Sequence, residues 1–377
     1  MKYSSLKRAA IVKLSTFISL LFTSQFCSAQ IPVNNPVDPA DTELTNAVDF
    51  LSRYFHEFDN RQSPDYSKYW DAEDCKEYKH PDQLVYGINT EWPTYRIGKP
   101  TILYAKPENG YVHIKTLFGK GDSTGKVSVM SITNHYIAHD NNNTLHFISP
   151  IRLAAKTWNT TEVGNITYHY PSYHHFDKAK AKMLTGNISA LERDWGLQPI
   201  KIRYYFADTK EELEHLRGFD FTVAMGNRDK PSGMSDDTDN IVYCGGWGEN
   251  YFHEVVHIYL NRHYPQSPLR EGLAVFYGGS LGHELPWHIK RLNEYLQKHG
   301  EIDFGKDDFY YLDNYTNPNS TIMGMLCLDA YNKNGVAGLK HIMAYTSLDE
   351  IMAKEFGIGK RGLNAFLRKM INDNSKI

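Results

Sequence analysis

Apolar and polar residues alternate in the first part of the chain and recur at helical spacing in the second. The first predicted helix has Asp41 as its N-cap. Its apolar residues lie at helical spacing: Leu44, Val48, Leu51, Phe55 and Phe58. Runs rich in β-branched and aromatic residues then predict strands, with Gly-, Asn- and Asp-containing turns between them. These runs are Thr101–Ala105, Tyr111–Phe118, Lys126–Ala138 and Thr144–Lys156. We therefore expect a helix followed by an antiparallel sheet over residues 42–160.

From residue 165 onward the pattern becomes mainly helical. Short strands are predicted at Ile200–Phe206 and Ile241–Cys244, with a polar loop at Gly233–Asn240 between them. The predicted helices are Ala179–Trp195, Thr209–Leu216, Glu249–Leu260, Pro286–Lys298, Ser320–Asn332, Val336–Tyr345 and Lys360–Asn372. The chain is thus expected to have an α+β fold. A strand-rich accessory domain would precede a mainly helical domain with a small sheet over residues 165–377.

A five-residue motif in the second domain carries the strongest chemical signal. It reads His253-Glu254-Val255-Val256-His257, within a predicted helix. Residues four apart lie on one face of a helix, so both imidazoles can reach one metal ion. In the H-E-x-x-H pattern the carboxylate between them is the general base and not a ligand. A catalytic zinc site needs a third protein ligand and one open position for water.

Two downstream residues compete for the third ligand position. His263 stands at the spacing of the longer pattern H-E-x-x-H-x-x-G-x-x-H, but Leu260 occupies the glycine position, where a turn with positive φ is needed. Glu271 lies in the first turn of a second predicted helix, after Pro265 and Pro268. The small residues that follow Glu271 would let this helix pack closely on the first. We favour Glu271.

The H-E-x-x-H motif followed by Glu271-Gly272-Leu273-Ala274 resembles the gluzincin metallopeptidases, in particular the peptidase MA-like group. The resemblance covers residues 165–377. It implies a zinc peptidase in which Glu254 activates water and Glu271 completes the ligand set. Thermolysin-like enzymes support a ligand histidine with an Asp four residues past the ligand Glu. Val275 stands there in this chain, so the second partners of the imidazoles are unassigned.

The resemblance also implies a donor for the oxyanion and an edge strand that binds a peptide substrate. Tyr315 is our choice for the donor, ahead of its neighbours Tyr310 and Tyr311 and of His283. The strand at Ile241–Cys244 is expected to be the substrate-binding edge. A paired inner strand is the alternative. In the first domain, a helix followed by curved strands resembles the nuclear-transport-factor type, and an ordinary α+β accessory domain fits equally well.

Composition and the N-terminal segment point to an exported protein. Net charge is −3 and the sequence pI is near 6.6, so nothing indicates a nucleic-acid partner. Residues 1–29 have a basic start, an apolar stretch and small residues before Ala29, which predicts a signal peptide cleaved after Ala29. Residues 30–41 are expected to be a flexible linker, and no later apolar run is long enough to cross a membrane. We expect a secreted or periplasmic protein with three remaining cysteines, Cys75, Cys244 and Cys327.

Other functions remain open on these residues. The chain could be a secreted peptide- or glycan-binding protein with a non-catalytic zinc site. It could also be a zinc hydrolase of a non-peptide amide or ester. A second metal site from His113, His135, His139 and His146 is disfavoured, since scattered strand histidines are more often hydrogen-bonded or at the surface.

Overall fold

The computed structural model describes residues 31–58, 64–84, 98–226, 230–304 and 315–376. The predicted signal peptide and two of the tyrosines considered as oxyanion donors, Tyr310 and Tyr311, lie outside these residues. The chain divides into two compact units. Unit 1 comprises Met1–Asp71 and Ile88–Ile148, and unit 2 comprises Ala72–Gly87 and Ser149–Ile377.

Unit 1 is a helix packed on an antiparallel sheet. Helix α2 (Thr42–Glu57) begins where predicted, because the Asp41 carboxylate accepts a hydrogen bond from the Leu44 amide at 3.1 Å. The strands β1 (Lys99–Glu108), β2 (Tyr111–Gly121), β3 (Val127–His139) and β4 (Leu145–Ile148) follow in sheet order. A short 3-10 turn, η2 (Tyr66–Lys68), lies between helix and sheet in the sequence.

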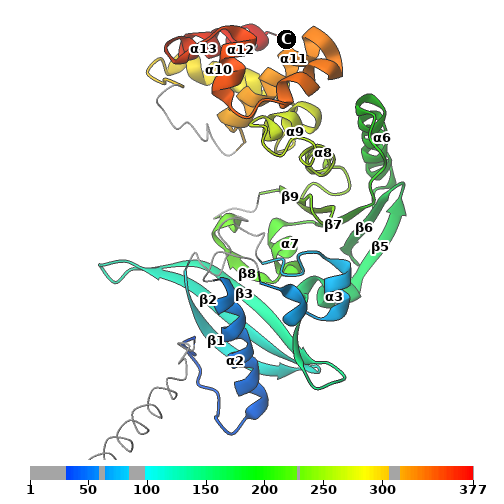
Figure 1. The fold of residues 1–377 in the computed structure, drawn as a ribbon, viewed down its shortest axis with the longest axis vertical. Coiled ribbons are helices and arrows are strands. Elements are labelled where there is room, and N and C mark those ends of the chain that lie inside the picture. The colour runs from blue at the N-terminus through cyan, green and yellow to red at the C-terminus, as the bar shows by residue number, and fades with distance from the viewer. Residues whose placement is uncertain (1–30, 59–63, 85–97, 227–229, 305–314, 377) are drawn as a thin grey trace, which may run out of the picture. The chain divides into compact units, whose positions relative to one another are not determined.

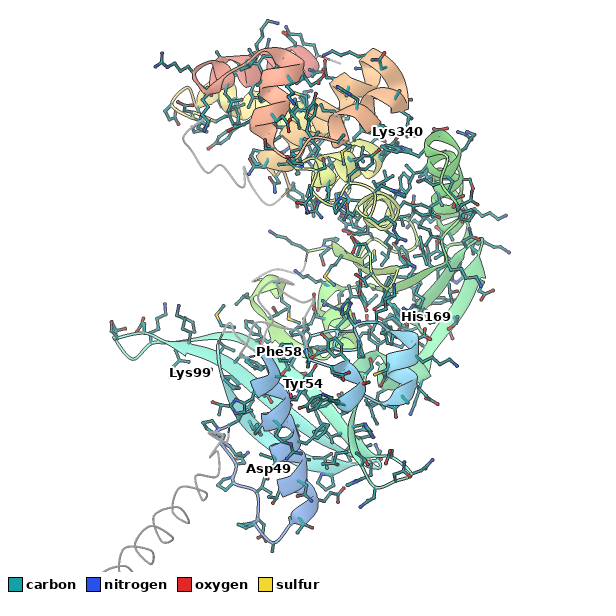
Figure 2. The ribbon with its side chains drawn as sticks, viewed as in Figure 1. Asp49, Tyr54, Phe58, Lys99, His169 and Lys340 are labelled. Carbon is teal, nitrogen blue, oxygen red and sulfur yellow. The ribbon has the colours of Figure 1, made fainter. Side chains whose placement is uncertain are left out.

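Aromatic side chains hold α2 against this sheet. Tyr54 on α2 is buried and its ring lies 4.7 Å from that of Phe147 on β4 (Figure 2). The Trp70 indole donates a hydrogen bond of 3.1 Å to the Tyr54 hydroxyl, so the polar end of Tyr54 is also satisfied. Phe58 meets Tyr54 edge to face.

The fourth predicted strand is shorter than expected. β4 ends at Ile148, and helix α5 (Pro150–Ala154) and the turn η4 (Ala155–Thr157) occupy the rest of the predicted run. Pro150 lacks an amide proton and its φ suits the first turn of a helix, so it ends the sheet pairing and starts α5.

Unit 2 contains a five-stranded mixed sheet. Its spatial order is β5 (Trp158–Val163), β6 (Ile166–Pro171), β7 (Ile202–Ala207), β10 (Ile241–Gly245) and β9 (Ser232–Asp236). β6, β7 and β10 run parallel, whereas β5 and β9 are antiparallel to their neighbours. Short elements of the same unit are α3 (Ala72–Glu77), α7 (Lys210–Leu216), β8 (Phe219–Thr222) and η5 (Val223–Met225).

Two expectations for this sheet are wrong. The predicted loop Gly233–Asn240 contains most of β9, and the predicted edge strand Ile241–Cys244 is an inner strand, paired with β7 on one side and β9 on the other. β9 is the strand at the end of the sheet among the described residues. Its sequence, Ser-Gly-Met-Ser-Asp, lacks apolar alternation, which is why it reads as a loop.

From α6 onward the helices of unit 2 follow the predicted order, except for α12 (Leu348–Phe356), which the sequence did not predict. They are α6 (Lys178–Trp195), α8 (Phe252–Leu260), α9 (Arg270–Gly278), α10 (Leu285–Lys298), α11 (Pro318–Met343), α12 (Leu348–Phe356), the turn η6 (Lys360–Gly362) and α13 (Leu363–Asn374) (Figure 1). α11 has non-helical dihedrals at Asn334 and Gly335, so it consists of the two helices that the sequence predicts. The α+β fold is confirmed.

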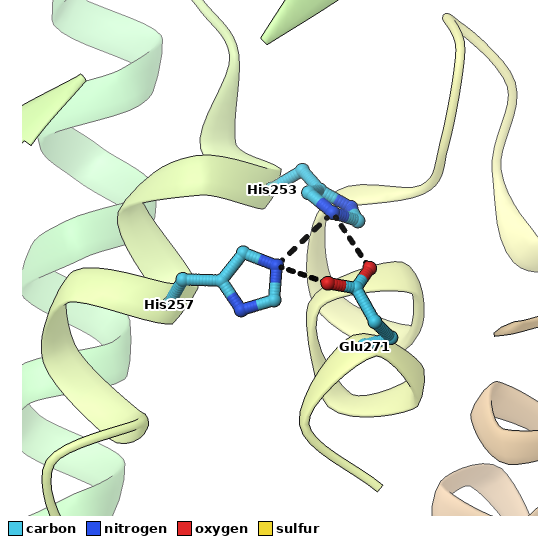
Figure 3. A group of neighbouring side chains, drawn as sticks. All are labelled: His253, His257 and Glu271. Atoms are coloured by element: carbon cyan, nitrogen blue, oxygen red, sulfur yellow. Dashed lines mark hydrogen bonds and ion pairs between the residues drawn. The ribbon is translucent and has the colours of Figure 1, made fainter. Parts of the chain in front are cut away.

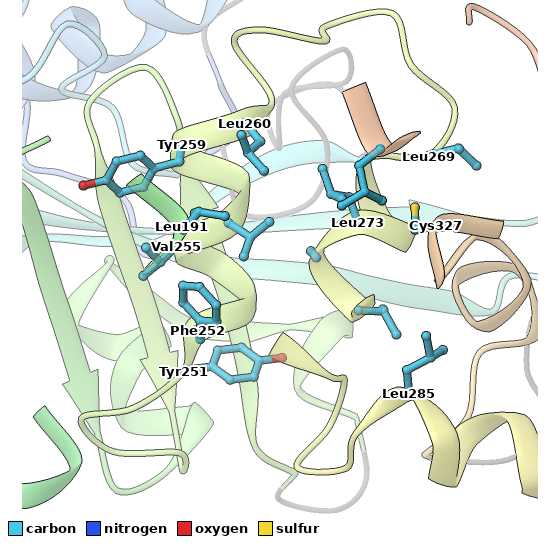
Figure 4. Packing of buried hydrophobic residues seen from close by; sticks show 14 of the residues in the cluster. Leu191, Tyr251, Phe252, Val255, Tyr259, Leu260, Leu269, Leu273, Leu285 and Cys327 are labelled. Carbon is cyan, nitrogen blue, oxygen red and sulfur yellow. The ribbon is translucent and has the colours of Figure 1, made fainter. Parts of the chain in front are cut away.

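The core of unit 2 surrounds α8, and every residue of this helix is buried. Figure 4 shows Val255 and Leu260 from α8 and Leu273 from α9, which all belong to one apolar cluster. A helix that is buried on all sides is held rigidly by its neighbours, which suits a scaffold for ligand side chains. Within the described ranges, we find no helix with the length and hydropathy needed to cross a bilayer.

Candidate metal centre

Helix α8 places the two histidines of the motif side by side. His253 and His257 are separated by one helical turn, and their Nε2 atoms lie 3.3 Å apart. Both residues are 6% exposed. Two imidazole nitrogens at this separation in a buried setting are arranged to share one positive centre.

Glu271 completes the group. It lies in the first turn of α9 (Figure 3). One of its carboxylate oxygens is 3.3 Å from His257 Nε2, and the other is 3.6 Å from His253 Nε2. The ligand atoms of the three residues all lie within 4.8 Å of one another, and among the described residues no other such group occurs. The Glu271 side chain is 61% exposed, so the group opens to solvent on the side of the carboxylate. This His-His-Glu group could hold a metal ion.

The outer nitrogens of both imidazoles have their own partners. His253 Nδ1 lies 2.7 Å from the Gly279 carbonyl oxygen, and His257 Nδ1 lies 3.3 Å from Asn261 Oδ1. A carbonyl oxygen can only accept, so His253 donates from Nδ1. In the neutral ring this leaves the Nε2 lone pair free for a metal. This pattern of outer hydrogen bonds is typical of metal-ligating histidines. The residues therefore fit a metal ion.

Without a metal, the three side chains form an ion-pair network. Burial alone would lower the pKa of His253, but the hydrogen bond to Glu271 and the nearby carboxylates outweigh it and raise this pKa to about 8. Glu271 is largely exposed, but neighbouring atoms remove part of the water around its carboxylate, which alone would raise its pKa; the contacts with His253 and His257 outweigh this and lower the pKa to about 2. A carboxylate that stays ionised over the physiological range is suited to bind a cation.

Glycines let the helices approach closely enough to form the group. A Cβ on Gly278 would lie 2.4 Å from the His253 amide nitrogen, so the end of α9 touches the start of α8. Gly272 was expected to face α8, but its Cβ position lies 2.4 Å from the Met323 carbonyl carbon, so it serves the contact between α9 and α11 instead. A side chain at either position would push the helices apart.

A buried ionic cluster fixes the chain just before α8. Glu249 is 1% exposed and accepts hydrogen bonds from His174 Nε2 at 3.0 Å and from the Asp177 amide at 2.6 Å. The other ring nitrogen of His174 lies 2.6 Å from Asp208. These contacts join the N-terminus of α6 to the segment that leads into the motif.

A cavity of ≈ 440 Å³ opens around the group. Glu254 lines it and is 6% exposed, but it is not among the three clustered ligand residues. Residues 232–235 of β9 form another wall, and a Cβ on Gly233 would lie 3.0 Å from the Cγ of Glu254. The edge strand therefore lies directly against the side chain of Glu254. Tyr251, Asn261 and Leu281 complete the lining.

Other residues considered from sequence lie elsewhere. His263 is exposed and is not in the metal-binding group. Tyr315 is 53% exposed and its ring lies 6.3 Å from that of His283, and neither residue lines the cavity. In unit 1, His113, His139 and His146 each pair with a neighbour, respectively Glu108, the Asn143 carbonyl and Asp140, as expected for strand histidines. Within the described residues, Cys75, Cys244 and Cys327 form no disulfide; Cys244 and Cys327 are buried and Cys75 is half-buried.

Sequence reasoning missed three contributors to the site. Asn261 stands one helical turn after His257, and this i,i+4 spacing was an available signal. Tyr251 stacks on His253 with ring centres 5.7 Å apart, and its position two residues before His253 gave no such signal. The Gly279 carbonyl is a backbone group, and no residue type marks it in a sequence.

Comparisons with family models, with curated proteins and with solved structures give no match for this chain. The chemistry of the centre follows from its own residues.

Proposed function

We propose that this protein is a zinc-dependent metallopeptidase of the gluzincin, peptidase MA-like type. His253, His257 and Glu271 would hold the ion, and a bound Zn²⁺ would supply an activated water and polarise the scissile carbonyl. The observation that carries the proposal is the placement of Glu254. It is a buried carboxylate in the same cavity as the three ligands but outside the ligand set. A purely structural site does not need such a group.

Glu254 is the general base in this proposal. Its carboxylate accepts the proton of the attacking water and then donates it to the leaving amine. His253 and His257 bind the ion as neutral rings. Their contacts with Gly279 and Asn261 fix the orientation of the rings, so the ion would keep its position beside Glu254. The oxyanion donor that we proposed from the sequence is Tyr315. Tyr251, which lines the cavity, is a second candidate for that role.

The presence of the edge strand β9 beside the cavity favours a peptide as the substrate, in preference to a small ester or amide. An extended peptide can pair with its free backbone groups and would then run along the wall beside Glu254. The substrate-binding edge is therefore proposed to be β9 in place of the inner strand β10. Export to the periplasm or the medium, after cleavage at Ala29, remains part of the proposal and rests on the sequence of residues 1–29.

The test is digestion of an unbiased peptide library by the zinc-loaded protein, read by mass spectrometry. We expect cleavage by the wild type and a loss of at least about a hundredfold in Glu254→Gln, since proton transfer contributes on this scale. Zinc content, measured by plasma mass spectrometry, should be the same in both proteins. Glu271→Ala should lose both zinc and cleavage.

Two results would contradict the proposal. Equal cleavage by wild type and Glu254→Gln would remove Glu254 from the chemistry. Stoichiometric zinc with no cleavage of any peptide would favour a binding protein with a non-catalytic site, or a hydrolase of another amide or ester.

A further inference from the structure

A second cavity lies near the metal centre but shares no lining residue with it. Its volume is ≈ 430 Å³, and residues of α6, α9, α10 and α11 and the segment before α8 line it. Asn250 and Phe252 face this cavity, whereas Tyr251 and His253 line the metal cavity. The segment 250–253 therefore contributes side chains to both cavities.

About half of the wall is apolar. Phe252 and Leu285 are buried, and both appear in Figure 4 among the core residues. Phe276, Tyr277 and Leu328 add further apolar surface, and Met183, whose side chain is 60% exposed, also contributes. A cavity of this size and lining can enclose the apolar body of a small organic molecule, about as large as an aromatic ring with a short chain.

One acidic side chain that lines this cavity has no partner in the part of the chain that the structure describes. Glu284 precedes α10, makes no side-chain capping bond, and has no ion pair or side-chain hydrogen bond within the described residues. No Lys or Arg side chain is among the lining residues. A carboxylate with no cationic side chain beside it favours a ligand that brings a positively charged N–H donor.

We propose that this cavity binds a small organic cation, namely a primary amine attached to an aromatic or similarly sized apolar body. The ammonium group donates to the Glu284 carboxylate. The apolar body contacts Phe252, Phe276 and Leu328. Neutral or anionic molecules of the same shape leave the carboxylate unpaired and bind more weakly.

The experiment titrates the full-length protein with 2-phenylethylamine and, as a matched neutral probe, with 2-phenylethanol, by calorimetry and by saturation-transfer NMR. We expect saturable amine binding, weaker binding of the alcohol, and a loss of about fivefold in amine affinity in Glu284→Gln, the upper range for a partly exposed ion pair. Glu294→Gln, a charge change at an exposed position of the same helix, should bind the amine like the wild type. Leu328→Trp, which fills the cavity, should abolish binding while the far-ultraviolet circular dichroism stays unchanged.

Three results would overturn the proposal. One is the absence of saturable amine binding to the wild type, and another is equal affinity for the amine and the alcohol. The third is amine binding that Glu284→Gln leaves intact but Glu271→Gln removes, because the amine would then occupy the metal cavity.

Discussion

At the scale of single residues, His253 and His257 are held by different kinds of partner. A backbone carbonyl accepts from His253, whereas the Asn261 side chain faces His257. The first contact cannot be removed by substitution of a side chain, but the second can. The two ligands therefore allow the effect of an outer hydrogen bond on metal binding to be measured separately from ligation.

Asn261→Ala should weaken zinc binding by about tenfold or more, because the His257 ring would lose the group that orients it. Asn261→Asp keeps an acceptor at the same position and should retain or increase the affinity. Competition with a chromophoric chelator would measure both. Unchanged affinity in the alanine variant would mean that the 3.3 Å contact does not orient the ring.

Zinc binding should also depend on pH in a defined direction. The pKa of His253 is raised to about 8 without metal, so near pH 7 the ion must displace a proton, and affinity should rise with pH until about 8. In the metal-free protein, the stability of the fold depends on pH in the opposite direction. The contribution of His253 to the free energy of unfolding is fully present below its ordinary pKa of 6.5 and is lost as pH rises through about 8. Calorimetry in buffers of different ionisation enthalpy would count the released protons, and their absence at pH 7 would contradict this assignment.

At the scale of elements, close helix packing sets the geometry of the centre. Gly278→Ala should lower the free energy of unfolding by about 1–3 kcal/mol, because the new methyl group would overlap the backbone at His253. Gly186→Ala is the matched control, since Gly186 lies within α6 with nothing near its Cβ position. It should stabilise the protein by up to about 1 kcal/mol. Urea unfolding would compare the free energies of unfolding of the two variants. Equal values would show that α8 and α9 can move apart without a loss of stability.

The elements also show what the sequence could and could not predict. The H-E-x-x-H motif in α8 and the helix start predicted after Pro268 for α9 identified the group formed by His253, His257 and Glu271. Apolar periodicity was less reliable for the strands. It missed β9, because an edge strand with small polar residues carries no apolar alternation. It extended β4 too far, because the apolar residues around Pro150 fit a helix as well as a strand. The strand expected at the edge is therefore an inner strand, although the three residues of the His-His-Glu group were identified.

At the scale of the whole molecule, a segment of the N-terminal half is built into unit 2. Residues 72–84 cluster with the second unit. Asp239 accepts from the Lys79 and His80 amides, and Gln83 accepts from the Tyr243 hydroxyl and from Arg217. Such contacts join residues more than a hundred positions apart, and no local pattern in the sequence indicates them.

Gln83→Leu should destabilise unit 2 by about 1–3 kcal/mol, because the buried Tyr243 hydroxyl would lose its acceptor. Gln297→Leu changes the same side chain at an exposed position and should alter stability by less than about 0.5 kcal/mol. Hydrogen exchange would locate the effect. Faster exchange in β7 and β10 of the Gln83 variant is expected, and exchange that changed only in unit 1 would contradict it.

The position of β9 has a consequence for cleavage specificity. Neighbouring side chains of an extended peptide point to opposite sides of a sheet. A peptide added to β9 would direct every second side chain towards the sheet's covered face and the others towards solvent. Sequence preferences around the cleaved bond should then have a period of two residues, with selective positions separated by permissive ones. A single dominant position, or selectivity at consecutive positions, would indicate that substrates do not bind as an added strand.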